Sequence, residues 1–172
     1  MSRIPALLIE NASENIRPTL ESVQKGLGFL PNTFRTLAHS PAALNGFMQF
    51  NQAMGKSSLS ASQREAVALA ASQVNGCDYC LAAHSLFAQK AGLSASEIRD
   101  ARHGQLNEFA RFALHVTESR GQVTDVQLSE ARQAGLNDAQ IVEIIAQVAL
   151  LTFTNYLNNV AATDIDWPAI ED

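Results

Sequence analysis

Four helix starts constrain the fold of this chain more than any other feature of its sequence. At each start a small polar residue stands three positions before a Glu or Gln, so that each side chain can bond the other residue's backbone amide. The four segments begin at Ser60, Ser94, Thr124 and Asn137. Because only a helix start leaves such amides free, the pattern predicts a helical fold.

Apolar periodicity fills the chain between these starts with helices and leaves no clear strand. We expect helices over residues 14–25, 32–38, 41–54, 61–74, 77–90, 95–103, 106–119, 125–134 and 138–160. A length of 172 residues fits one domain over 1–172, with residues 1–25 as an N-terminal extension and first helix and 165–172 as a C-terminal tail. The predicted fold class is all-α, a helical bundle.

The longest apolar run covers residues 144–153 and is interrupted by Gln147. It is shorter than the roughly 20 residues that cross a bilayer, so we expect a buried helix and no membrane partner. Its predicted core face is made by Ile141, Ile144, Ile145, Val148 and Leu151. A formal charge of −5 with scattered Lys and Arg excludes nucleic acid as a partner. The first residues do not read as a secretory signal, so we expect a cytoplasmic protein.

Both cysteines fall in the segment Cys77-Asp-Tyr-Cys80-Leu-Ala-Ala-His84, directly after Asn75-Gly76. On a helix, spacings of three and four place the two sulfurs and the imidazole on one face. A helix N-terminus favours the thiolate of Cys77, and His84 can take the proton of Cys80 or stabilise its thiolate. In a reducing compartment such a pair is more often catalytic, redox-sensing or metal-binding than structural.

Glu65 lies on the helix that precedes the cysteines. The chain reverses near Gly76, so the two helices are predicted to form a hairpin that brings Glu65 toward His84. A carboxylate in that position orients the imidazole and raises its basicity.

The pattern Glu65, eleven residues, Cys77-x-x-Cys80-x-x-x-His84 resembles the AhpD-like alkylhydroperoxidases of the carboxymuconolactone decarboxylase-like superfamily. The segments 28–41, 155–159 and 164–168 resemble its peroxidase-related branch. The likeness extends over roughly residues 26 to 168.

This resemblance implies an all-helical enzyme that assembles as a homotrimer or homohexamer and reduces organic hydroperoxides. Cys80 would attack the peroxide and Cys77 would resolve the sulfenic acid as a disulfide, while Glu65 and His84 relay protons. A lipoyl-bearing or thioredoxin-like protein would reduce the disulfide, and no cofactor or metal is required. Tyr79 stands where the better-known pattern carries a histidine, which leaves open any proton path through that position.

Other readings of the same residues remain at this point. Cys77, Cys80, His84 and Glu65 could ligate zinc, although no second cysteine pair exists. The chain could also be a thiol-disulfide oxidoreductase or decarboxylase-like enzyme with another substrate, or a non-enzymatic redox sensor. Residues 59–84 align with 137–162 as a possible duplicated helical hairpin, which places Asn155 and Asn158 where the cysteines stand. Those asparagines could cap a helix or contact a neighbouring subunit.

Overall fold

The four predicted helix starts are capped as the sequence indicates. In each of them the capping side chain accepts from the third helical amide, and the Glu or Gln side chain accepts in return from the cap's own amide. At Ser94 these two hydrogen bonds measure 3.3 and 2.8 Å. Capping of this kind is worth about 1 kcal/mol at each helix.

The computed structural model describes residues 2–168, and the regular elements of this part of the chain are all helical. Met1 and residues 169–172 of the predicted C-terminal tail lie outside the described residues. A short 3-10 helix, Ile9–Asn11, precedes nine α-helices: α1 (Arg17–Leu27), α2 (Asn32–Leu37), α3 (Pro41–Met54), α4 (Ala61–Val74), α5 (Asp78–Lys90), α6 (Ala95–Arg102), α7 (Glu108–Glu118), α8 (Asp125–Gln133) and α9 (Asp138–Ala161). The all-α prediction is confirmed.

The first helix begins three residues later than predicted, at Arg17. Pro18 explains the shift, because proline has no amide hydrogen and fits only the first turn, where no intrahelical bond is needed. A helix starting at residue 14 would place that proline beyond its first turn. The predicted range 14–25 is therefore wrong at both ends, and α1 runs to Leu27.

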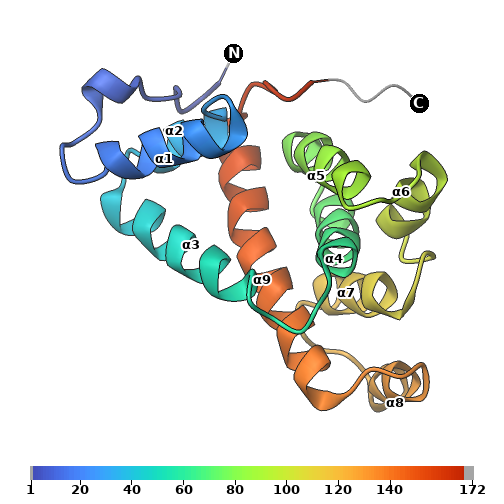
Figure 1. The fold of residues 1–172 in the computed structure, drawn as a ribbon. Helices are drawn as coiled ribbons and strands as arrows, with labels where there is room; N and C mark the ends of the chain where they lie inside the picture. The colour runs from blue at the N-terminus through green and yellow to red at the C-terminus, as the bar shows by residue number, and fades with distance from the viewer. Residues whose placement is uncertain (1, 169–172) are drawn as a thin grey trace.

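Helix α4 forms the centre of the bundle. Seven consecutive residues, 66–72, are buried, so this helix is enclosed on all sides. It packs against α5, α6, α7 and α9, which surround it in Figure 1. A helix that is enclosed on every face is a rigid mount for the side chains it carries.

Helix α9 runs through the middle of the molecule, between the α1–α3 layer and the α4–α7 group (Figure 1). Within the described part of the chain it is the one helix long and apolar enough to span a membrane by length and composition, but it packs against α3, α4, α5 and α7 as a core helix does. Ile144, Val148 and Leu151 are buried as predicted. Ile145 is not: it is 46% exposed, because it lies on the opposite side of α9.

The aligned segments 59–84 and 137–162 follow different chain paths. The first is broken at Asn75-Gly76 into the hairpin of α4 and α5, whereas the second is the continuous helix α9. The likeness between the two segments is therefore one of sequence and does not extend to the path of the backbone.

Candidate active site

The two cysteines lie where α4 turns into α5. Gly76 has a left-handed backbone with φ 61°, which favours glycine, and the amide of Cys77 donates to the Ser72 carbonyl at 3.0 Å. Cys77 is the N-cap of α5, and its Sγ accepts from the amide of Cys80 at 3.2 Å. The predicted position of Cys77 at a helix N-terminus is confirmed.

Cys77 and Cys80 are joined as a disulfide, with their Cα atoms 5.2 Å apart. Cys77 is fully buried and Cys80 is 3% exposed. Cys80 lines an internal cavity, whereas Cys77 is not among the residues around that cavity. The two sulfurs therefore differ in their access to a small molecule.

His84 and Glu65 meet across the α4–α5 hairpin, as the sequence predicted. The imidazole Nδ1 and Glu65 Oε2 are 2.8 Å apart, and both side chains are 20% exposed. An ionised carboxylate can only accept, so this contact holds the proton on Nδ1 and leaves Nε2 free to exchange one. The pair is a base with its orientation fixed by a carboxylate.

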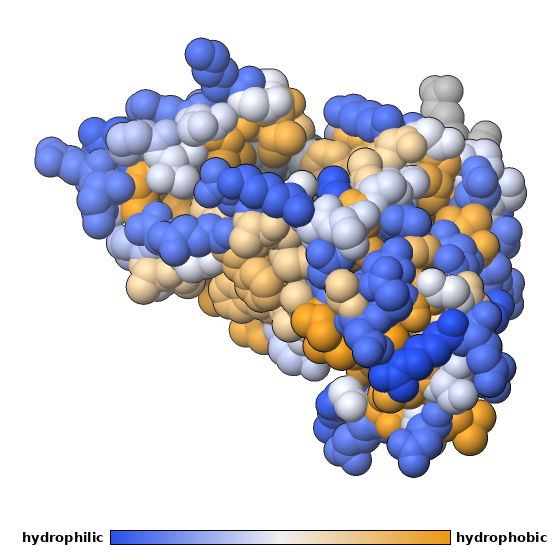
Figure 2. Space-filling view, turned by 60° about the horizontal axis from the view of Figure 1, so that its bottom comes forward, coloured by the Kyte–Doolittle hydropathy of each residue, from blue (hydrophilic) through white to orange (hydrophobic). Residues whose placement is uncertain are grey.

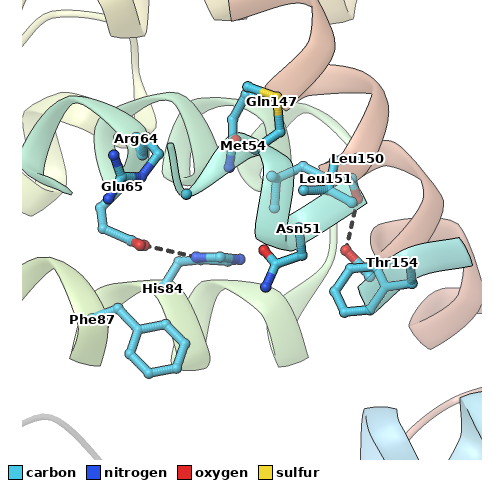
Figure 3. A pocket seen from close by; sticks show the side chains of 12 residues that line it. Asn51, Met54, Arg64, Glu65, His84, Phe87, Gln147, Leu150, Leu151 and Thr154 are labelled. Carbon is cyan, nitrogen blue, oxygen red and sulfur yellow. Dashed lines mark hydrogen bonds and ion pairs between the residues drawn. The ribbon is translucent and has the colours of Figure 1, made fainter. Parts of the chain in front are cut away.

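Two connected chambers meet at His84. The first, of about 210 Å³, reaches Cys80 and is walled by Phe34, Phe47, Phe87 and Trp167; we call it the aromatic chamber. The second, of about 300 Å³, contains the polar side chains of Asn51, Arg64, Glu65 and Gln147; we call it the polar chamber. Figure 3 shows Glu65 and His84 facing each other in the polar chamber, with Gln147 entering from α9. Phe47, Asn51, His84, Phe87 and Thr154 line both.

Tyr79 is buried, and its hydrogen bonds join separate segments of the chain in an arrangement that we call the structural clasp. Its hydroxyl donates to Asp166 Oδ1 at 2.8 Å and accepts from the amide of Thr33 at 3.2 Å. The other Asp166 oxygen accepts from the amide of Asn32 at 2.8 Å. Burial, reinforced by the Asp166 carboxylate, raises the pKa of Tyr79 far above its ordinary value. Tyr79 therefore stays neutral and ties α5 to α2 and to the segment after α9.

Trp167 extends this clasp over the aromatic chamber. Its ring packs edge-on against Phe29 and Phe87, with ring centroids 5.0 and 5.2 Å away, and also contacts Tyr79. Contacts between residues so distant in sequence cannot be read from periodicity. The segment 164–168 singled out by the sequence thus contributes Trp167 to the wall of the cavity.

Three asparagines of α9 contact the active-site turn. Asn155 Nδ2 donates to Ser72 Oγ at 3.1 Å, and its Oδ1 accepts from Asn75 at 2.8 Å. Asn159 Nδ2 donates to the Asn75 carbonyl at 2.8 Å. Asn158 Nδ2 lies 3.4 Å from Cys80 Sγ. Of the three, Asn158 contacts a cysteine, and the sequence did not indicate this contact.

Within residues 2–168, no three His, Cys, Asp or Glu side chains gather as a metal site would require. The predicted site residues Glu65, Cys77, Cys80 and His84 do lie together, around one hairpin. They form a disulfide pair beside a carboxylate-oriented imidazole. The side chains of Tyr79, Asn158 and Asp166 complete the arrangement.

Comparisons with known proteins agree with this fold. The carboxymuconolactone decarboxylase family matches residues 41–107, a range that contains all four predicted site residues. No curated protein sequence matches the chain. An uncharacterized peroxidase-related protein from Ralstonia eutropha JMP134, described as an alkylhydroperoxidase AhpD core, is 26% identical, with a TM-score of 0.85 over 96% of this chain and 92% of that one.

Two further solved structures share the fold at lower identity. The debrominase Bmp8, in complex with 2,3,4-tribromopyrrole, is 20% identical, with a TM-score of 0.79 over 96% of this chain and 92% of its own. An uncharacterized peroxidase-related protein from Silicibacter sp. TM1040 is 22% identical, with a TM-score of 0.78 over 94% and 92%. Residues 41–107 thus match the carboxymuconolactone decarboxylase family, and the fold of the chain is AhpD-like.

Proposed function

We propose that this protein is a thiol-dependent peroxidase that reduces organic hydroperoxides in antioxidant defence. The observation that carries the proposal is the Cys77–Cys80 disulfide beside the His84–Glu65 pair, on a cavity with an aromatic wall. The aromatic chamber suits the organic part of a hydroperoxide, and the polar chamber suits the water and protons that His84 exchanges.

The proposed cycle assigns a different step to each cysteine. His84 takes the Cys80 proton, and the thiolate attacks the terminal oxygen of the hydroperoxide, so that the O–O bond breaks and an S–O bond forms. The protonated His84 returns its proton to the leaving alkoxide, which departs as an alcohol. Cys77 then attacks the sulfenic acid, forming the disulfide and releasing water.

The different surroundings of the two sulfurs support these roles. Cys80 lines the aromatic chamber, where a peroxide can reach it, while Cys77 is enclosed. Sulfenic acid should therefore form at Cys80 and be resolved by Cys77. Glu65 keeps His84 oriented through both proton transfers.

We also propose the partners that this cycle needs. A dithiol protein, lipoyl-bearing or thioredoxin-like, returns two electrons to the disulfide in the cytoplasm. Copies of the chain assemble as a trimer or hexamer through an exposed face of α9, where apolar residues recur at spacings of three and four: Val142, Ile145, Ala149, Phe153, Tyr156 and Val160. Figure 2 shows apolar side chains gathered across the middle of one face of the molecule.

The test is steady-state reduction of cumene hydroperoxide with dihydrolipoamide or thioredoxin as the donor. Cys80→Ser should abolish turnover, and Cys77→Ser should accumulate a sulfenic acid that dimedone traps at Cys80. Variants that consume peroxide as fast as the parent would refute the proposal. A parent protein that forms its disulfide once, but is not reduced again by any donor, would instead be a redox sensor.

A second candidate function is thiol-dependent reduction of a halogenated aromatic compound. The five Phe, Tyr and Trp side chains around the aromatic chamber favour a planar ligand, and the fold is shared with a debrominase. In this reaction the two thiols supply two electrons and two protons: the carbon–bromine bond breaks, one proton takes the place of bromine on the ring, and bromide, the second proton and the disulfide are the other products. Bromide release from a bromopyrrole under the same reductant, faster than peroxide consumption, would favour this candidate.

A further inference from the structure

We propose that Asn158 is a further active-site residue, which holds the Cys80 sulfur with its amide nitrogen and receives the substrate O–H with its amide oxygen. The first half of this proposal concerns the redox couple alone. The second half rests on the proposed peroxidase function.

The amide nitrogen of Asn158 contacts the sulfur that reacts. Nδ2 lies 3.4 Å from Cys80 Sγ, and the side chain is 4% exposed, so water does not compete for the contact. A disulfide sulfur is a weak acceptor, whereas a thiolate is charged and accepts strongly. The contact therefore stabilises the reduced, ionised form of Cys80 more than the disulfide, and so makes the couple more oxidising.

The amide oxygen of Asn158 has no hydrogen-bond partner among the described residues, although it is buried. A buried acceptor without a partner is costly, and such atoms are commonly paired with a ligand or with water. Asn158 lines the aromatic chamber together with Cys80. We infer that a ligand in the chamber completes Oδ1 with a donor, and the terminal O–H of a hydroperoxide is one.

Neighbouring hydrogen bonds hold Asn158 in place along α9. Asn155, one turn before Asn158, is bonded to Ser72 and to Asn75. These contacts end on the α4–α5 turn that carries Cys77. The amide of Asn158 is therefore placed by the same turn that places the sulfurs.

Both contacts serve a single step of the cycle. When the thiolate attacks the terminal oxygen, the O–O bond breaks, the S–O bond forms, and the hydrogen stays on the transferred oxygen. Oδ1 thus binds the O–H of the substrate first and the O–H of the Cys80 sulfenic acid afterwards. His84 remains the donor to the leaving alkoxide.

The first test measures the thiol–disulfide equilibrium of the parent and variants against glutathione, which requires no peroxide. Asn158→Leu removes the donor and should shift the equilibrium about tenfold toward the disulfide, since bonds to charged groups are stronger than neutral ones. That shift corresponds to about 30 mV. Asn158→Asp replaces the donor with a carboxylate that repels the thiolate, so its shift should be at least as large. Asn159→Leu is the matched control, because it removes an asparagine amide of α9 that does not contact sulfur. It should shift the thiol–disulfide equilibrium less than about twofold.

Equal shifts in Asn158→Leu and Asn159→Leu would overturn the sulfur contact, as would no shift in either Asn158 variant. Asn158→Asp preserves the shape and the acceptor, so it keeps the test valid if Asn158→Leu does not fold.

The second test compares two rates for reduced Cys80 in a Cys77→Ser background. Cumene hydroperoxide carries the O–H that Oδ1 would receive, whereas methyl methanethiosulfonate has no such donor. Asn158→Leu should slow the hydroperoxide reaction about tenfold more than the thiosulfonate reaction. Equal slowing would overturn the role of Oδ1. A parent that reacts with thiosulfonate but not with hydroperoxide would refute the proposed function, while leaving the glutathione result to decide the sulfur contact.

Discussion

Replacing Tyr79 with phenylalanine tests the structural clasp behind the cysteines. The change removes the hydroxyl that donates to Asp166 and accepts from the amide of Thr33. The expected loss in the free energy of unfolding at neutral pH is roughly 2.5 kcal/mol. This is the sum of two lower limits, one for the loss of a hydrogen bond to a charged carboxylate and one for a buried amide that is left unpaired.

The same substitution should change how stability depends on pH. The folded protein holds Tyr79 neutral because burial raises the pKa of its hydroxyl, whereas in the unfolded chain it ionises near its ordinary value of 10.0. The contribution of Tyr79 is therefore complete below that pH and is lost as the pH rises above it. The gap between parent and Tyr79→Phe should narrow by about 1.4 kcal/mol for each pH unit above about 10.

Urea unfolding of the oxidised proteins at several pH values measures this gap. All other groups titrate in both proteins, so their contribution cancels in the difference. Tyr156→Phe is the control when every protein compared carries Ile145→Glu, which opens the proposed α9 interface; Tyr156 is the other tyrosine and is 55% exposed in the single chain. Its removal should leave both the stability and the pH dependence unchanged. A gap between parent and Tyr79→Phe that stays constant through this range would refute the buried, neutral hydroxyl.

Three further substitutions test the relay, the caps and the assembly. Glu65→Gln should slow sulfenic acid formation about 100-fold, because the neutral amide no longer stabilises a charged imidazole, and stopped-flow rates check this; an unchanged rate would exclude Glu65 from the relay. Ser94→Ala should cost about 1 kcal/mol in urea unfolding through loss of its capping box, whereas an unmoved midpoint would contradict the capping argument. Ile145→Glu should dissociate the oligomer in sedimentation equilibrium, while Val126→Glu, on the exposed face of α8, should not; a parent that is already monomeric would contradict the proposed α9 interface.

The sequence predicts local structure here because its signals are local. Capping boxes act within one turn, and α4, α6, α8 and α9 start where their caps indicate. The contact between Glu65 and His84 also follows from a hairpin closed by a short turn. Apolar periodicity alone places the start of α1 too early, because it takes no account of Pro18, which is the stronger constraint.

The remaining parts of the site depend on contacts between distant segments. Tyr79 meets Asp166 across 87 residues, and Cys80 meets Asn158 across 78. No periodicity or spacing specifies such pairs. The only available signal was compositional: asparagines in an apolar helix, which must be hydrogen-bonded if they are buried.

The enclosure of α4 determines where motion can occur during a redox cycle. Glu65 lies on this helix and Asn158 on α9, so the carboxylate that orients His84 and the amide keep their positions while the sulfurs bond and separate. We therefore expect rearrangement in the first turn of α5 and in the segment 164–168, which carries Trp167 of the cavity wall. Amide hydrogen exchange should respond to reduction in those two short stretches and remain slow in α4, which would make the proposed cycle a local opening in an otherwise stationary frame.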